Sequence, residues 1–199
     1  MSRTNGTTGN NIQIRNKIAE YQQKIQNARN KTSNLSGQIE EYSRCIQKVQ
    51  EEIIQYQEQI RQLEQRIEGL RQALEKVKDM KRKFDDNYRR RKGKTEAVLN
   101  YTRHPVIPMR YCNGMKSLLV GKEFERANRG FDNSQTMIKR RVEELLQEIE
   151  NLKQRIRECE NRINEYQYHI NLANQTISGL NDEISGYENT IRTLRMQLQ

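Results

Sequence analysis

The stretch IEEYSRCIQKVQEEIIQYQEQIRQLEQRI, residues 39–67, decides the fold. Isoleucine returns at every seventh position of this stretch, at Ile39, Ile46, Ile53, Ile60 and Ile67. A second apolar or aromatic residue follows three positions after each of the first four isoleucines. A repeat of about 3.5 residues is slightly shorter than one α-helical turn, so helices with this pattern wind around each other as a left-handed coiled coil. The stretch therefore predicts a long helix with a narrow apolar seam.

The seam continues beyond this stretch and recurs in the second half of the chain. From Ile14 to Phe84 its positions alternate by four and three residues, and only Thr32 and Lys81 are polar. The same spacing resumes at Ile138 and includes a second set of seam isoleucines, Ile149, Ile156, Ile163 and Ile170. Cys159 occupies a seam position, so we interpret it as a small core residue. Two long helices are predicted.

The segment between the two helices, NYTRHPVIPMRYCNGM at 100–115, favours a reversal of the chain. Pro105 and Pro108 lack the amide hydrogen that a continuous helix requires, and Asn113-Gly114 is a turn signal. We therefore expect an all-α fold, a long antiparallel helical hairpin with a proline-containing turn. The expected boundaries are a disordered tail at 1–11, a first helix at 12–99, a turn at 100–116 and a second helix at 117–199.

The start of the second helix depends on SLLVGKEFERANRGF, residues 117–131. Tracing the seam backwards from Ile138 places these positions on it: Ser134, Phe131, Ala127, Phe124 and Val120. We predict a helix from near Ser117 with fraying or a kink near Gly130, and the alternative is a start capped by Asp132 or Asn133. Because one hairpin seam is thin, we expect two hairpins to join as a four-helix bundle, in a homodimer or a heterodimer, or to form a longer coiled-coil oligomer.

The composition excludes several classes of protein. The chain is 33% hydrophobic and 31% charged and contains no Trp, which is too little apolar material for a compact globular domain of 199 residues. Cys45, Cys112 and Cys159 form neither a disulfide framework nor a zinc-binding spacing. The N-terminus lacks the apolar region of a signal peptide, and no stretch is long and apolar enough to span a membrane. These features predict a cytoplasmic protein with reduced thiols.

The sequence also lacks the motifs that are typical of a catalytic site. The two histidines, His104 and His169, have no convincing partners, and no glycine-rich phosphate loop, metal-ligand spacing or nucleophile motif occurs. We expect no enzymatic activity, no cofactor, no metal and no small-molecule substrate.

Positive charge is concentrated around the predicted turn. Residues 76–141 contain 19 Lys and Arg against 7 Asp and Glu, a net charge of +12, whereas the whole chain carries +10. The densest run is KRKFDDNYRRRKGK at 81–94, whose cations are Lys81, Arg82, Lys83, Arg89, Arg90, Arg91, Lys92 and Lys94. Phe84 and Tyr88 within it continue the seam. The run predicts either contact with phosphates, anionic lipid or an acidic protein, or a solvated helical face.

One short motif resembles a known family. Leu119-Val120-Gly121, followed by Lys122, Phe124 and Phe131, and the upstream LRQALEKVKDMKRKFDDN at 70–87 resemble the WXG/LXG-type helical-hairpin proteins of Gram-positive type VII secretion. More narrowly, the chain looks like the small helical-hairpin partners that accompany LXG toxins. The chain departs from the family in having no Trp and no Tyr-X-X-X-Asp/Glu export motif.

The resemblance implies a chaperone-like adaptor that pairs helix to helix with an LXG-type toxin domain or a second small helical protein. Leu119 and Gly121 would form the turn, Phe124 and Phe131 would pack on the partner, and export would follow a route without a signal peptide. The alternative is a cytoplasmic structural or tethering coiled coil whose basic tip binds nucleic acid or an anionic membrane.

Overall fold

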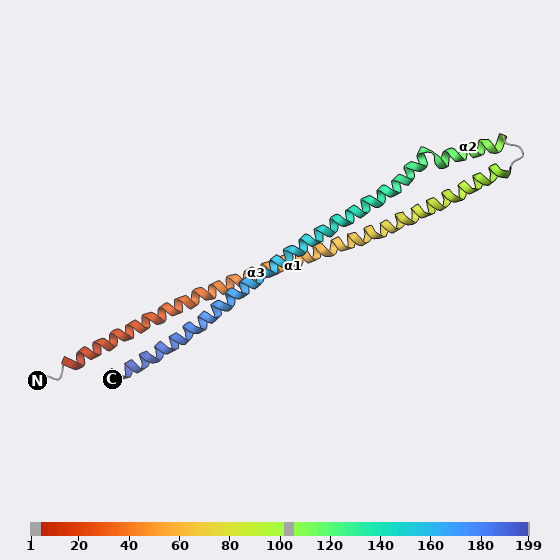
Figure 1. Cartoon of the computed structure of the whole chain (residues 1–199). Coiled ribbons are helices and arrows are strands. Elements are labelled where there is room, and N and C mark those ends of the chain that lie inside the picture. Colours follow the sequence, from red (N-terminus) through yellow and green to blue (C-terminus); the bar gives the residue numbers. More distant parts are fainter. Residues whose placement is uncertain (1–4, 102–105, 199) are drawn as a thin grey trace. The chain divides into compact units, whose positions relative to one another are not determined.

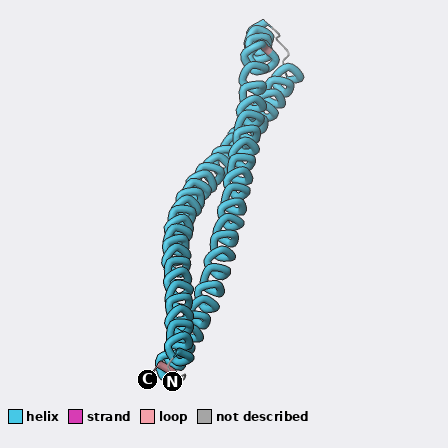
Figure 2. Tube along the Cα trace, turned by 90° about the vertical axis from the view of Figure 1, so that its left-hand side faces the viewer, coloured by secondary structure: helices cyan, strands magenta, loops and turns pink. Residues whose placement is uncertain are grey.

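The computed structural model describes residues 5–101 and 106–198, and within these ranges the chain is helical without strands (Figures 1 and 2). Helix α1 extends over Asn5–Tyr101, α2 over Val106–Val120 and α3 over Lys122–Met196. The chain divides into two compact units, and in each of them α1 pairs with a returning helix that runs in the opposite direction. The prediction of an all-α antiparallel helical hairpin is confirmed.

The first unit, which we call the terminal unit, comprises Met1–Gln55 and Ile156–Gln199. Its two helices meet through aromatic pairs, with ring centroids 5.5 Å apart between Tyr21 and Tyr187 and 5.8 Å apart between Tyr42 and Tyr166. The two pairs are separated by three heptads on both helices, so the seam runs without a slip. The buried apolar residues of this unit lie on the same seam: Ile14, Ile25, Ala28, Val49, Cys159, Ala173 and Ile191.

The second unit, the tip unit, comprises Tyr56–Arg155 and holds the main apolar core. Five buried residues form this core: Leu63, Ile67, Leu145, Ile149 and Leu152. Leu145 is only 1% exposed. Because burying one leucine contributes roughly 1.5–3 kcal/mol, a few such residues hold the two helices together.

All nine seam isoleucines predicted from the heptads are buried or half-buried, from Ile39 to Ile170. Ile67 and Ile149 are buried, and the other seven are half-buried because a single opposing helix covers only part of each seam side chain. The oligomer expected from this thin seam stays a prediction.

The predicted turn at 100–116 is wrong over most of its length. Helix α1 continues to Tyr101 and α2 begins at Val106, while His104 and Pro105 lie outside the described residues. Pro108 falls in the first turn of α2, where a helix does not require its missing amide hydrogen. The predicted disordered tail at 1–11 is also wrong from Asn5 onward, where α1 begins.

Asn113-Gly114, interpreted as a turn signal, lies inside α2. Cys112, which precedes this pair, and Leu119, further along α2, are both buried, and their burial outweighs the cost of about 1 kcal/mol for a glycine in a helix. The tertiary contacts of α2 therefore override the local turn preference.

The predicted helix start at Ser117 and the predicted kink at Gly130 both need correction. The helix breaks at Gly121, and α3 runs from Lys122 through Gly130 and on past the alternative start at Asp132 or Asn133. Figure 1 shows this break between the segments labelled α2 and α3.

The seam of α3 also passes through different residues from those predicted. Asn128 and Gln135 are half-buried, whereas Ala127 and Ser134 are exposed. The regular alternation by three and four residues is kept from Phe124 to Leu145 only when it passes through the two polar residues. The side chain of Val120, predicted to lie on the seam, is outside the described part of the structure.

Candidate interaction site at the basic tip

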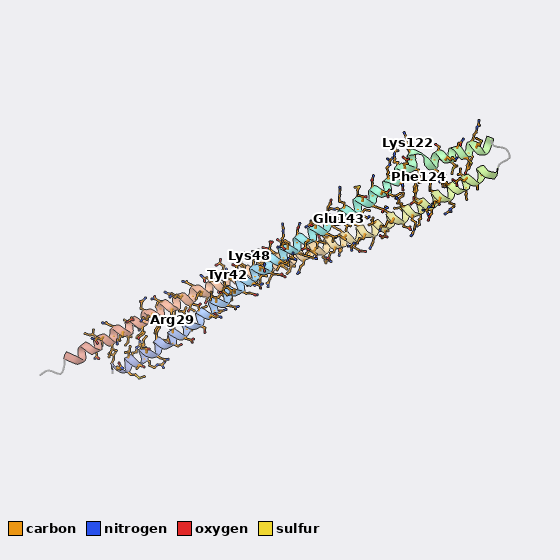
Figure 3. The ribbon with its side chains drawn as sticks, viewed as in Figure 1. Arg29, Tyr42, Lys48, Lys122, Phe124 and Glu143 are labelled. Atoms are coloured by element: carbon orange, nitrogen blue, oxygen red, sulfur yellow. The ribbon has the colours of Figure 1, made fainter. Side chains whose placement is uncertain are left out.

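An aromatic cluster joins α1 to the beginning of α3. Phe84 stacks on Phe124 at 5.1 Å between ring centroids and lies tilted against Phe131 at 5.5 Å. Tyr88 stacks on the same Phe124 at 4.5 Å. Pairs of this kind stabilise by about 0.5–1.5 kcal/mol beyond the area they bury. Phe124, labelled in Figure 3, and Phe131 thus already pack within the chain, whereas the family resemblance assigns both to a partner.

Gly121 shapes the break that precedes this cluster. Its carbonyl oxygen accepts hydrogen bonds from the backbone amides of Phe124 and Glu125, at 3.1 and 3.3 Å, and so begins the ladder of α3. A Cβ at this position would meet the backbone carbonyl oxygen of Ser117. The break therefore needs glycine for space. Leu119 and Gly121 lie at this bend between α2 and α3, away from the reversal of the chain.

Helix α2 is held against α1 by a buried polar contact. The Cys112 thiol is 0% exposed and donates a hydrogen bond to the Thr95 carbonyl at 3.6 Å. Thr95 is also buried, and its hydroxyl donates to the Arg91 carbonyl at 2.9 Å. Sequence reasoning missed both residues, although Thr95 lies one heptad after Tyr88 and could have been found by extending the seam.

Half of the eight predicted tip cations have acidic partners. Lys81 pairs with Asp132 across the two helices at 2.6 Å. Arg82 and Lys83 both contact Asp79, and their hydrogen bonds, Lys83 first, lower the pKa of the Asp79 carboxyl. Arg89 lies 3.9 Å from Asp86.

The other four cations lack an acidic partner within the described part of the chain. These residues, all exposed, are Arg90, Arg91, Lys92 and Lys94. Because these four cations lie within a segment of five residues, they repel one another, and binding of an anionic ligand would relieve this repulsion. Within the described residues, four cations of the basic run are thus paired with carboxylates and four are not.

Two adjoining hollows lie on one side of the tip. One, of about 380 Å³, includes Asn87 and Arg91 of α1 and Met115, Leu118 and Leu119 of α2. The other, of about 370 Å³, continues past Lys94 and Val98 of α1 and Tyr111 of α2, and shares Arg91 and Met115 with the first.

The lining residues recur at helical spacing. The α1 wall steps by four, three and four residues through Asn87, Arg91, Lys94 and Val98, and the α2 wall by four and three through Tyr111, Met115 and Leu118. Each set occupies one face of its helix. We call the space between these two faces the tip groove.

Other candidate sites are weaker. His169 is half-buried and stacks on Tyr42 with ring centroids 5.4 Å apart, which is a packing role. Across the described ranges, His, Cys, Asp and Glu side chains form no group of three or more that could hold a metal ion. None of the helices, over their described residues, is long and apolar enough to cross a membrane.

Comparison with known proteins gives one family. The family model described as coiled-coil domain-containing protein 171 matches residues 12–199 of the chain. Comparison with curated proteins and with solved structures found no match.

Proposed function

We propose that this chain, which belongs to the family of coiled-coil domain-containing protein 171, is a non-enzymatic cytoplasmic tether whose basic tip binds an anionic membrane surface. The observation that carries this proposal is the set of four exposed cations without acidic partners at residues 90–94.

The expected affinity for an anionic membrane can be estimated from the number of tip cations that lack an acidic partner in the described ranges. A basic residue close to an anionic membrane contributes about 1 kcal/mol, so four contribute about 4 kcal/mol, or roughly a thousandfold in affinity. This attraction extends over a Debye length of about 10 Å at 0.1 M salt and weakens as salt is added. Binding would be moderate and strongly dependent on salt.

An anionic membrane is favoured over nucleic acid by the apolar residues beside the cations. Tyr111 on α2 is exposed and lines the same hollow as Arg91 and Lys94, and Met109 on the same helix is also exposed. Such side chains gain free energy at a lipid interface, where Tyr in particular is enriched. The described part of the tip has no exposed row of aromatic rings of the kind that stacks on single-stranded nucleic acid.

Flotation with phosphatidylserine vesicles tests the proposal. The full chain is expected to bind at 50 mM salt and to be released at 300 mM. The double variant R90E/K92E should weaken binding by at least about 30-fold, because each reversal removes an attraction of about 1 kcal/mol and adds repulsion. The matched control K31E/K48E makes the same change in charge at exposed lysines of the terminal unit that have no acidic partner in the described ranges, and it should bind almost as the wild type does.

Three results would contradict the membrane tether. They are no binding to anionic vesicles at low salt, equal losses in both double variants, and tighter binding to a DNA or RNA oligonucleotide than to vesicles under the same conditions.

The second candidate is the adaptor that pairs with an LXG-type toxin domain or a second small helical protein for type VII secretion. One observation favours a partner near the Leu-X-Gly motif: Leu118 is 68% exposed. Co-purification with an LXG-type domain, lost on Leu118→Ser, would support this adaptor. Absence of binding to such a domain would argue against it.

A further inference from the structure

The tip groove has one apolar wall and one cationic wall. Tyr111 and Leu118 on α2 are 61% and 68% exposed, and Met115 between them is half-buried. On α1, Arg91 and Lys94 line the same groove and have no acidic partner in the described ranges. Exposed apolar side chains gathered at one place, in a chain with a mean hydropathy of −1.09, mark an interaction surface.

The groove is formed before any ligand arrives. The contact between the Cys112 thiol and the Thr95 carbonyl fixes α2 on α1. The bend at Gly121 sets the direction of α2 relative to α3, and the stacked Phe84 and Phe124 close the inner end of the groove. A preformed site binds without the cost of ordering its walls.

We propose that the tip groove binds an acidic amphipathic helix of a partner protein. A third helix laid between α1 and α2 would place an apolar ridge, spaced i, i+4 and i+7, against Tyr111, Met115 and Leu118. Acidic residues on the flank of that helix would face Arg91 and Lys94. The charges of the groove thus select an acidic partner.

The dimensions define the partner further. The α1 wall covers 12 residues from Asn87 to Val98, and the 11 steps between them span about 16 Å at about 1.5 Å per residue. A helix of about three turns fills this length. At the α3 end the groove meets Glu123, whose carboxylate is paired with Arg126 at 3.3 Å, so this acidic residue adds little repulsion.

This site overlaps the membrane contact proposed above, which also uses Arg91 and Lys94, but one pair of cations distinguishes the two contacts. Arg90 and Lys92 line neither hollow of the groove, whereas Arg91 lines both and Lys94 lines one. The two pairs carry equal charge and alternate along the same helix. Reversing Arg90 and Lys92 should therefore weaken membrane binding alone, whereas reversing Arg91 and Lys94 makes the same change in net charge and should also weaken binding of the acidic helix.

The probe is a fluorescein-labelled 15-residue peptide with Leu on one helical ridge and Glu on its flanks, and binding to the full chain is followed by fluorescence anisotropy. We expect saturable binding at low micromolar concentration. A peptide of the same composition in scrambled order should bind at least tenfold more weakly, because it keeps the charge but loses the ridge.

Variants of the full chain locate the site. R91E/K94E should weaken binding of the peptide at least tenfold and R90E/K92E less than threefold, with helix content by circular dichroism unchanged in both. Tyr111→Ser combined with Leu118→Ser removes the apolar wall at exposed positions and should weaken binding to a similar extent as R91E/K94E.

Each contrary outcome overturns the docking site. Equal binding of the ordered and scrambled peptides would mean that the tip attracts any polyanion and does not recognise an apolar ridge. Equal effects of the two charge reversals, or no binding of the acidic peptide, would remove the groove as its site. Failure of vesicle binding alone would leave this inference standing, because the peptide assay contains no lipid.

Discussion

Shortening Leu145 to alanine should destabilise the tip unit by about 3 kcal/mol. Leu145 is 1% exposed and lies in the core with Leu63, Ile67, Ile149 and Leu152. The substitution removes about three methylene equivalents at roughly 0.8 kcal/mol each, or about 2.4 kcal/mol, and a residual cavity adds a smaller cost. Its neighbour Leu146 is 45% exposed and absent from this core, so Leu146→Ala should cost less than about 1 kcal/mol.

Urea unfolding, followed by circular dichroism at several protein concentrations, measures the difference between the two variants. The concentration series separates stability of the single hairpin from any contribution of an oligomer. If Leu146→Ala costs as much as Leu145→Ala, the described packing does not account for the stability, and Leu146 is buried in an assembly. If Leu145→Ala costs less than about 1 kcal/mol, the proposed core is not the main source of cohesion.

Three further predictions concern single positions. Gly121→Ala should lower the melting temperature, because the new Cβ would meet the Ser117 carbonyl oxygen. Gly130→Ala should stabilise α3 by up to about 1 kcal/mol, because no described atom beyond the helix's own backbone lies within 4 Å of the new Cβ. Thermal unfolding of each variant measures the sign of its effect. Hydrogen bonds from Arg61 and then Gln62 lower the pKa of the Glu58 carboxyl from 4.5 to about 2, so the stabilisation from this group is complete above pH 4.5 and is lost as the pH falls toward 2. In a carboxyl NMR titration, Arg61→Ala should return this pKa toward 4.5. Burial raises the pKa of the Cys159 thiol, so iodoacetamide at pH 8 should modify it far more slowly in the folded chain than in urea.

The heptad repeat was sufficient to predict the helices and most of the seam. Isoleucine at every seventh position leaves few alternatives to a coiled coil, because any other structure would expose the whole row. The antiparallel hairpin followed from two such stretches and a proline-containing segment between them. These features depend on periodicity, which can be read from a sequence.

The tip could not be predicted in the same way. Pro108 and Asn113-Gly114 have local preferences for a turn, but the burial of Cys112 against α1 decides their structure. On α3, hydrophobicity favoured Ala127 and Ser134 over Asn128 and Gln135, whereas an unbroken spacing required the polar pair.

The tip groove depends on the bend at Gly121, and the sequence indicates a glycine there but not the direction of the bend. The four unpaired cations were within the predicted basic run. Arg82, Lys83 and Arg89 pair with acidic residues three or four positions away, a spacing that is visible in the sequence. Lys81 pairs with Asp132, which is distant in sequence, so only the fold reveals that contact.

The tyrosine pairs of the terminal unit restrict how this protein can change in length. A slip of one heptad would move Tyr42 from Tyr166 to Cys159 or Ala173, both small and buried, and would leave a void where two rings now meet. Inserting or deleting seven residues in one arm alone would force that slip on every pair beyond the change. Length variants that keep the fold should therefore gain or lose heptads in both arms together, at positions opposite each other.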